Sequence, residues 1–99
     1  MSYSVKLTDE VVRKLSGWHP STHEIREILK GFDALAADPI SHLIRVGPPD
    51  DTLQFDVIVT DSGQPGRDVL YAFTVRYGAD EETLFVVDCE LLAEDRPPP

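Results

Sequence analysis

The order of hydrophobic and polar residues divides this chain at Pro39. Before Pro39 the apolar residues recur mostly at helical spacing, and after it they alternate with polar residues, as in strands with one buried face. The start of the chain is an exception, because Tyr3, Val5 and Leu7 alternate with polar residues and predict a first strand. The pattern therefore predicts a strand, a helical region and then a series of strands.

The first helix is expected to begin at Thr8 and to end near Gly17. Threonine is a favourable N-cap, and glycine commonly follows the last turn of a helix. Trp18 lies in the turn that comes next and is expected to pack back on the core.

The second helix has the clearest boundaries in the chain. Ser21 and Glu24 have the spacing of a capping box, in which each side chain accepts a hydrogen bond from the other residue's backbone amide. Residues 25–36 carry a continuous apolar stripe at helical period, and Pro39 prevents the helix from continuing. Gly31 lies mid-helix, where glycine costs up to about 1 kcal/mol relative to alanine. It indicates close packing of the helix on the sheet.

Extended segments separated by turn-rich loops follow, at residues 43–46, 53–60, 69–77 and 84–92. Alternating strands joined in this way are typical of an antiparallel meander. We therefore predict an α+β fold in the order β-α-α-β-β-β, with two N-terminal helices packed on one face of a mainly antiparallel sheet. A single domain is expected over residues 1–93, followed by a disordered, proline-rich tail over 94–99.

Charge is distributed unevenly between the two halves of the chain. The 99 residues carry a formal net charge of −9, yet residues 1–49 hold six acids and six bases. Residues 50–99 hold twelve acids and three arginines. Such a field repels phosphate backbones and favours a basic protein partner, so direct binding of nucleic acid is disfavoured. The alternative is that the acids serve solubility alone.

Cysteine content and hydropathy predict a cytoplasmic protein. The single cysteine, Cys89, rules out an internal disulfide and fits a reducing compartment. No apolar stretch approaches the roughly 18 residues of a membrane helix. Residues 1–7 lack the apolar core of a secretory signal. We expect no membrane association.

Two segments carry a resemblance to a known family, one at the end of the second helix and one among the strands. Phe32-Asp33-Ala34-Leu35-Ala36-Ala37-Asp38-Pro39 ends the second helix, and Leu70-Tyr71-Ala72-Phe73-Thr74-Val75-Arg76-Tyr77-Gly78-Ala79-Asp80 forms a strand and turn. With the closing strand Leu84-Phe85-Val86-Val87-Asp88, they resemble the RelE/ParE toxin superfamily of type II toxin–antitoxin systems, whose strand and turn read Tyr-Arg-x-x-Tyr-x-x-Asp. The resemblance covers nearly the whole chain and implies a toxin-type domain with an antitoxin as its partner.

The chain departs from this family where the family's ribonucleases carry their chemistry. Thr74 stands where the family usually has an arginine, and residues 88–96 lack the family's histidine or tyrosine. RNA cleavage needs cations to hold phosphates and to stabilise the transition state. These departures and the acidic charge disfavour a ribosome-dependent mRNA endoribonuclease, the activity expected if the chain is an enzyme. The resemblance still allows action by protein contact, as in gyrase-inhibiting members, or a member that has lost catalysis. An acidic, non-enzymatic module that binds a basic protein is the alternative.

The sequence predicts no catalytic residues, no metal site and no cofactor. His19 and His23 are four residues apart, as in some zinc-binding helices, but the cap at Ser21 places His19 outside the helix. His42 has no partner at a fixed spacing. Cys89 is expected to be a small buried hydrophobe, because it alternates with other apolar residues of its strand.

Six residues are candidates for partner contact: Arg67, Arg76, Tyr71, Tyr77, Asp88 and Glu90. The two tyrosines share one strand face with Phe73 and Val75. That face packs under the helices or, if exposed, suits a helical partner.

The charged candidates are assigned to the last two strands and to a loop. Asp88 and Glu90 are expected on the strand face opposite to Phe85, Val87, Cys89 and Leu91, with Arg76 across the hairpin. They form either a cross-strand ion pair of little energetic value or a polar pocket. Arg67 is expected to point to solvent from a loop over residues 61–67.

Overall fold

The computed structural model describes residues 3–46, 52–60 and 67–95, which contain three helices and five strands. In chain order the elements are β1 (Ser4–Leu7), α1 (Asp9–Gly17), α2 (Thr22–Ala37), α3 (Pro39–His42), β2 (Ile44–Val46), β3 (Thr52–Val59), β4 (Arg67–Tyr77) and β5 (Thr83–Asp95). The predicted α+β class is confirmed. The order begins with a strand and two helices as predicted, and β2 falls within the extended segment expected at residues 43–46. The structure adds the helical turn α3.

The five strands form one sheet in the order β1-β5-β4-β3-β2. Strands β2 to β5 pair antiparallel, as the predicted meander requires, whereas β1 lies parallel to β5 at the edge of the sheet. Strand β5 continues to Asp95, so residues 94 and 95, which were expected in a disordered tail, belong to the sheet. Residues 96–99 lie outside the described part of the chain.

Local capping fixes the helix boundaries as predicted. The Thr8 hydroxyl accepts a hydrogen bond from the Val11 backbone amide and caps α1. In α2 the Glu24 amide donates to Ser21 Oγ at 3.1 Å, and the Ser21 amide donates to Glu24 Oε1 at 3.2 Å, which completes the capping box. Pro39 ends α2 and then serves as the first residue of α3, where its missing amide proton costs nothing.

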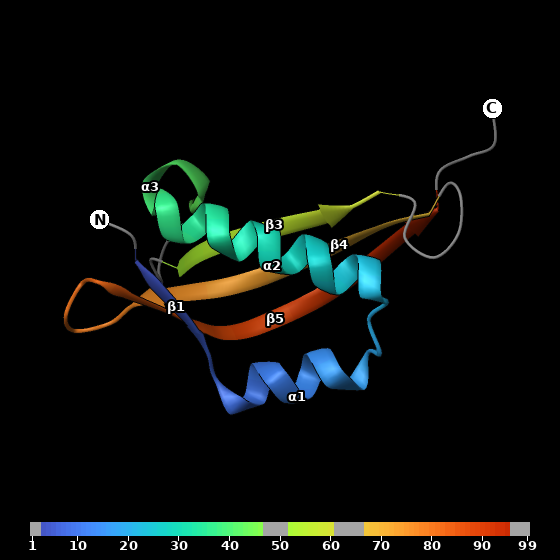
Figure 1. The fold of residues 1–99 in the computed structure, drawn as a ribbon, viewed down its shortest axis with the longest axis horizontal. Coiled ribbons are helices and arrows are strands. Elements are labelled where there is room, and N and C mark those ends of the chain that lie inside the picture. The colour runs from blue at the N-terminus through green and yellow to red at the C-terminus, as the bar shows by residue number, and fades with distance from the viewer. Residues whose placement is uncertain (1–2, 47–51, 61–66, 96–99) are drawn as a thin grey trace.

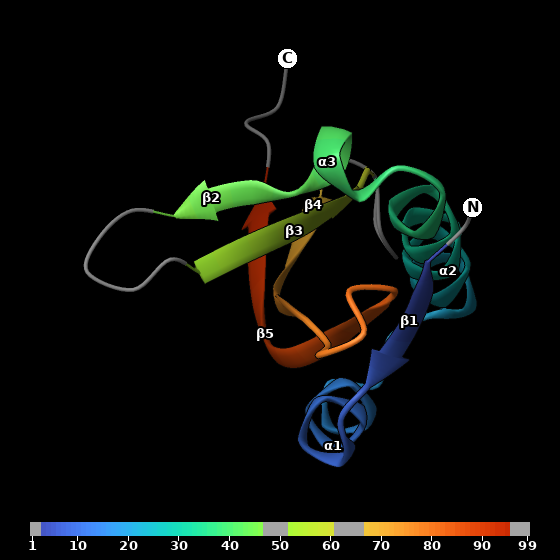
Figure 2. The ribbon, with the colours of Figure 1, turned by 90° about the vertical axis from the view of Figure 1, so that its left-hand side faces the viewer.

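The helix α2 lies on one side of a curved sheet, and α1 lies along the β5 edge of the sheet (Figures 1 and 2). Odd-numbered residues from Phe55 to Val59 in β3 and from Val69 to Val75 in β4 are buried beneath them, and α2 contributes three apolar side chains to the same core. The main members of this core are Ile28, Phe32, Leu35, Phe55, Val57, Val59, Val69, Tyr71, Phe73 and Val75. Trp18 packs against it as predicted, with its ring centroid 6.2 Å from that of Tyr71.

The predicted alternation of β5 is wrong at one point, because the strand contains a β-bulge. Thr74 pairs with Asp88 and Val75 pairs with Val86, so Val87 is an extra residue between the two pairs. The buried residues of β5 are consequently Leu84 and Val86 before the bulge and Cys89 after it. Cys89 is buried as expected, but Phe85 lies on the opposite face rather than beside it. A period-2 pattern cannot reveal such an insertion.

Gly31 allows α2 to approach the sheet. A Cβ at this position would lie 3.0 Å from Val57 Cγ2 and 3.3 Å from Phe55 Cζ. We expect Gly31→Leu to lower the free energy of unfolding by about 1–3 kcal/mol, because overpacking forces the helix from the sheet. Gly17→Ala is the control, since a Cβ there meets nothing within 4 Å. Urea unfolding of both variants measures the difference, and equal stability would contradict the close approach at Gly31.

Candidate protein-binding face

The side of the sheet opposite to α2 carries the even-numbered residues of β3 and β4 and the residues of β5 that pair with them. We call this side the open face, because its described side chains are exposed or only partly buried. Strand register aligns them in three rows across β3, β4 and β5. The rows are Ile58–Leu70–Leu92, Asp56–Ala72–Glu90 and Gln54–Thr74–Asp88.

The first row is aliphatic and largely exposed. Ile58 and Leu92 are 66% and 55% exposed, and Leu70 lies partly buried between them. A shallow hollow of about 280 Å³ adjoins these three residues and is also lined by Asp68. Single exposed aliphatic side chains are common, but three aligned neighbours on one sheet face form a patch suited to an apolar partner.

The second row is acidic and lies directly beside the aliphatic row. Asp56 and Glu90 flank Ala72, so their backbones are two strand spacings, or about 10 Å, apart. The Gln54 side-chain amide donates to Asp56 Oδ1 at 2.7 Å and orients that carboxylate. Because only a methyl group lies between the two acids, a cationic side chain above Ala72 can interact with both of them.

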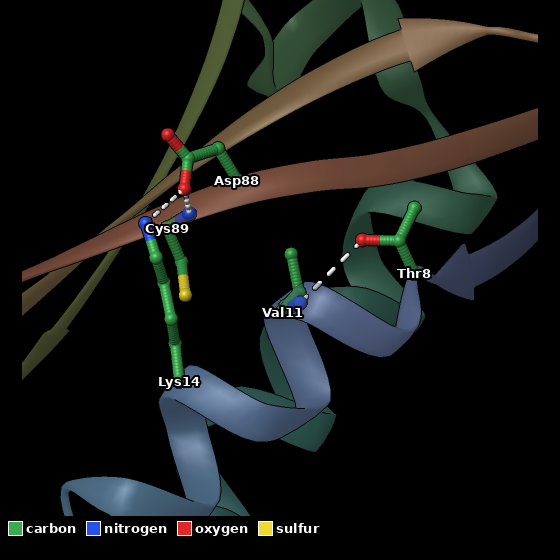
Figure 3. Close-up of polar contacts among 5 residues, drawn as sticks. All are labelled: Thr8, Val11, Lys14, Asp88 and Cys89. Carbon is green, nitrogen blue, oxygen red and sulfur yellow. Dashed lines mark hydrogen bonds and ion pairs between the residues drawn. The ribbon is translucent and has the colours of Figure 1, made fainter.

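Asp88, in the third row, forms an ion pair with a lysine of α1. Lys14 Nζ donates to Asp88 Oδ1 at 2.5 Å, and the Cys89 amide donates to the same oxygen at 2.9 Å (Figure 3). The hydrogen bond raises the pKa of Lys14 and lowers the pKa of Asp88. Both side chains are substantially exposed, so the pair adds little stability.

This pair corrects the predicted arrangement around Arg76. Register places Arg76 opposite Phe85 and places Thr74 opposite Asp88, so the ion pair of Asp88 forms with α1 and not across the hairpin. Arg76 is exposed at the far end of the open face. The alternation of apolar and polar residues contains no information on the bulge at Val87 or on the position of α1 at the β5 edge.

The two tyrosine candidates differ in location. Tyr71 is buried under α2, as the preferred interpretation of its strand face expected, and is therefore removed from any surface contact. Its hydroxyl donates to Glu24 Oε2, so the carboxylate of the capping box also ties α2 to the sheet. Tyr77 is exposed beside Tyr3, with the ring centroids 6.3 Å apart.

Of the remaining candidates, Glu90 lies on the open face and Arg67 is the first residue of β4, paired with Asp95. The predicted loop around Arg67 otherwise falls outside the described residues. Sequence reasoning missed Asp56 and Ile58. Ile58 carried a signal, since it is an aliphatic residue at a polar position of an alternating strand.

Two buried groups that ionise only at alkaline pH, a thiol and a phenol, are expected to make the free energy of unfolding depend on alkaline pH. Burial raises the pKa of the Cys89 thiol, and burial together with the hydrogen bond to Glu24 raises the pKa of Tyr71. In the unfolded chain the pKa is about 8.5 for cysteine and about 10 for tyrosine. Above these pH values the unfolded chain releases the two protons while the folded chain keeps them, so the free energy of unfolding falls as pH rises. We expect Cys89→Ala and Tyr71→Phe each to flatten part of this decline in urea unfolding between pH 8 and 11. A decline unchanged in both variants would contradict the assignment.

The described residues contain no cluster of three or more histidine, cysteine, aspartate or glutamate side chains that could hold a metal ion. Within the same segments, every helix is too short or too polar to cross a membrane. Comparisons with protein-family models, curated proteins and solved structures give no significant match.

Proposed function

We propose that this protein is a non-catalytic, RelE/ParE-like domain that acts by protein contact, and that its open face binds a partner offering basic and apolar side chains together. The observation that carries the proposal is the alignment of an exposed aliphatic row with an acidic row. Buried apolar area supplies affinity, and the acids select cationic partners and accelerate association.

The spacing of the rows favours an amphipathic helix as the bound element. Neighbouring strands are about 4.8 Å apart, and residues three or four apart on one helix face are separated by about 5–6 Å. A helix that crosses β3, β4 and β5 can place an apolar stripe on Ile58, Leu70 and Leu92. Lysine or arginine beside that stripe then meets Asp56 and Glu90.

Three features support protein contact over RNA cleavage. The open face is predominantly acidic: among the described residues its own basic side chain, Arg76, lies at one end, and Lys14, which reaches the face from α1, is paired with Asp88. Thr74, which stands where the resembled family usually has an arginine, lies between Gln54 and Asp88 on the same face. A phosphate backbone placed there would meet carboxylates rather than cations.

The toxin-type activity rests on the resemblance, which the observed order of a strand, two helices and a series of strands supports. The alternative is an acidic interaction module with no toxic action. Both hypotheses use the open face, so the binding surface alone does not separate them.

Expression in a bacterial host separates the two hypotheses. Growth arrest that the product of the neighbouring gene relieves, with ribosome-bound messenger left intact, is the result expected for a contact-acting toxin. Asp56→Lys/Glu90→Lys should abolish the arrest. The control Glu10→Lys/Glu27→Lys makes the same charge change on the helices and should preserve it. Normal growth of cells expressing the wild-type protein would exclude the toxin and leave the interaction module.

A further inference from the structure

A second apolar surface lies on the other side of the molecule, between α1 and α2. It is a groove of about 350 Å³ lined mainly by aliphatic side chains, including Val12 and Leu15 from α1 and Ile25 and Leu29 from α2. We call it the helix groove. Val12, Ile25 and Leu29 are 49%, 45% and 57% exposed although each lies on the apolar stripe of its helix. The stripes are therefore only partly covered by the sheet.

The charged residues beside the helix groove are arranged by sign. At 100° per residue, Asp9 and Arg13 follow the groove-lining residues of α1 on the solvent side, and Arg26 and Asp33 do so on α2. All four side chains are exposed. The two helices run in opposite directions (Figure 1). Asp9 and Asp33 therefore lie beside one end of the groove, and Arg26 lies beside the other end. Arg13 lies one helical turn from Asp9, toward the Arg26 end.

This arrangement is self-complementary under a two-fold axis. The axis lies in the plane of the interface and crosses the long direction of the groove at right angles, at its middle. The acidic end of one molecule then meets the basic end of the other, and the contact occurs twice. The exposed aliphatic side chains of both copies then cover one another. We propose that the helix groove is the interface of a homodimer, in which Arg26 of each copy faces the Asp33 end of the other.

The uneven charge of the chain agrees with this interface. Residues 1–49, which supply both helices, carry no net charge, whereas the net charge of −9 belongs to residues 50–99. Two copies that meet through their helices keep their acidic sheets apart, beyond the Debye length of about 8 Å at physiological salt. The dimer would also present two open faces outward. The interface is independent of the function proposed for those faces.

Sedimentation equilibrium of the full chain tests the dimer. The wild-type protein is expected to be dimeric at micromolar concentration, and Leu29→Glu is expected to be monomeric with an unchanged circular dichroism spectrum. Ile58→Glu, which introduces the same charge on the open face, should remain dimeric. A wild-type protein that stays monomeric up to its solubility limit would overturn the proposal.

Charge exchange tests the two-fold geometry without altering the apolar residues. Arg26→Glu and Asp33→Lys each place like charges at both ends of the interface, so each homodimer should weaken by at least about tenfold. Mixed in equal amounts, the two variants restore opposite charges at both ends and should form a heterodimer close to wild-type affinity. Failure of the mixture to associate, or undiminished homodimers of the single variants, would overturn this arrangement.

Discussion

Phe73→Ala is expected to lower the free energy of unfolding by about 3–5 kcal/mol, the largest stability effect we predict for a single residue. Phe73 is fully buried in the middle of β4 and contacts Phe32 of α2 edge to face, with ring centroids 5.0 Å apart. Truncation removes this contact and leaves a cavity between the helix and the sheet. Urea unfolding followed by the fluorescence of Trp18, the single tryptophan, measures the loss.

Ile58→Ala is the matched control, because Ile58 lies on the neighbouring strand but points to the open face. At 66% exposure its side chain gains little from folding, and we expect a cost below about 1 kcal/mol. The contrast between the two variants identifies which face of the sheet is buried. A cost at Ile58 comparable to that at Phe73 would mean that the open face is covered, and the proposed binding surface would be lost.

The second large effect concerns binding through the open face. We expect Asp56→Lys/Glu90→Lys to weaken binding of a short amphipathic helical peptide of leucine and lysine by at least about thirtyfold. Each reversal replaces an attraction by a repulsion and changes the binding free energy by roughly 1 kcal/mol at an exposed site. Two such changes together correspond to about thirtyfold in affinity. Fluorescence anisotropy of the labelled peptide measures the change, and the wild-type affinity should fall with added salt.

Two controls separate this effect from non-specific attraction by net charge. Glu10→Lys/Glu27→Lys alters the charge of the protein equally but on the helices, and should change the affinity by less than about threefold. A peptide with glutamate in place of lysine should not bind the wild-type protein. Equal losses in the two double variants would indicate that the overall field, and not the acidic row, attracts the peptide.

The predictions from sequence succeeded where the governing interactions are local. The capping box at Ser21 and Glu24, the helix stop at Pro39 and the close approach at Gly31 depend on a few neighbouring residues and on simple steric rules. Alternation likewise identified the buried face of β4, including Tyr71.

The site required information that no local pattern contains. The bulge at Val87 shifted the face of Phe85, and Asp88 obtained its partner from Lys14, which lies 74 positions away in the chain. The second role of Glu24, as acceptor for the Tyr71 hydroxyl, is another contact between distant segments. Rows across strands exist only once register is known, so Asp56 could not be placed beside Ile58 and Glu90 from sequence.

Chemical-shift mapping of the leucine–lysine peptide on the ¹⁵N-labelled 99-residue chain is the most direct test of the open face as a binding surface. Binding there predicts that the largest amide shifts fall on the open-face residues of β3, β4 and β5, centred on Ala72 between Asp56 and Glu90. The same titration of Asp56→Lys/Glu90→Lys should leave those amides unmoved. Shifts confined to α1 and α2, or no saturable shifts at all, would contradict the assignment of the open face as the site of protein contact.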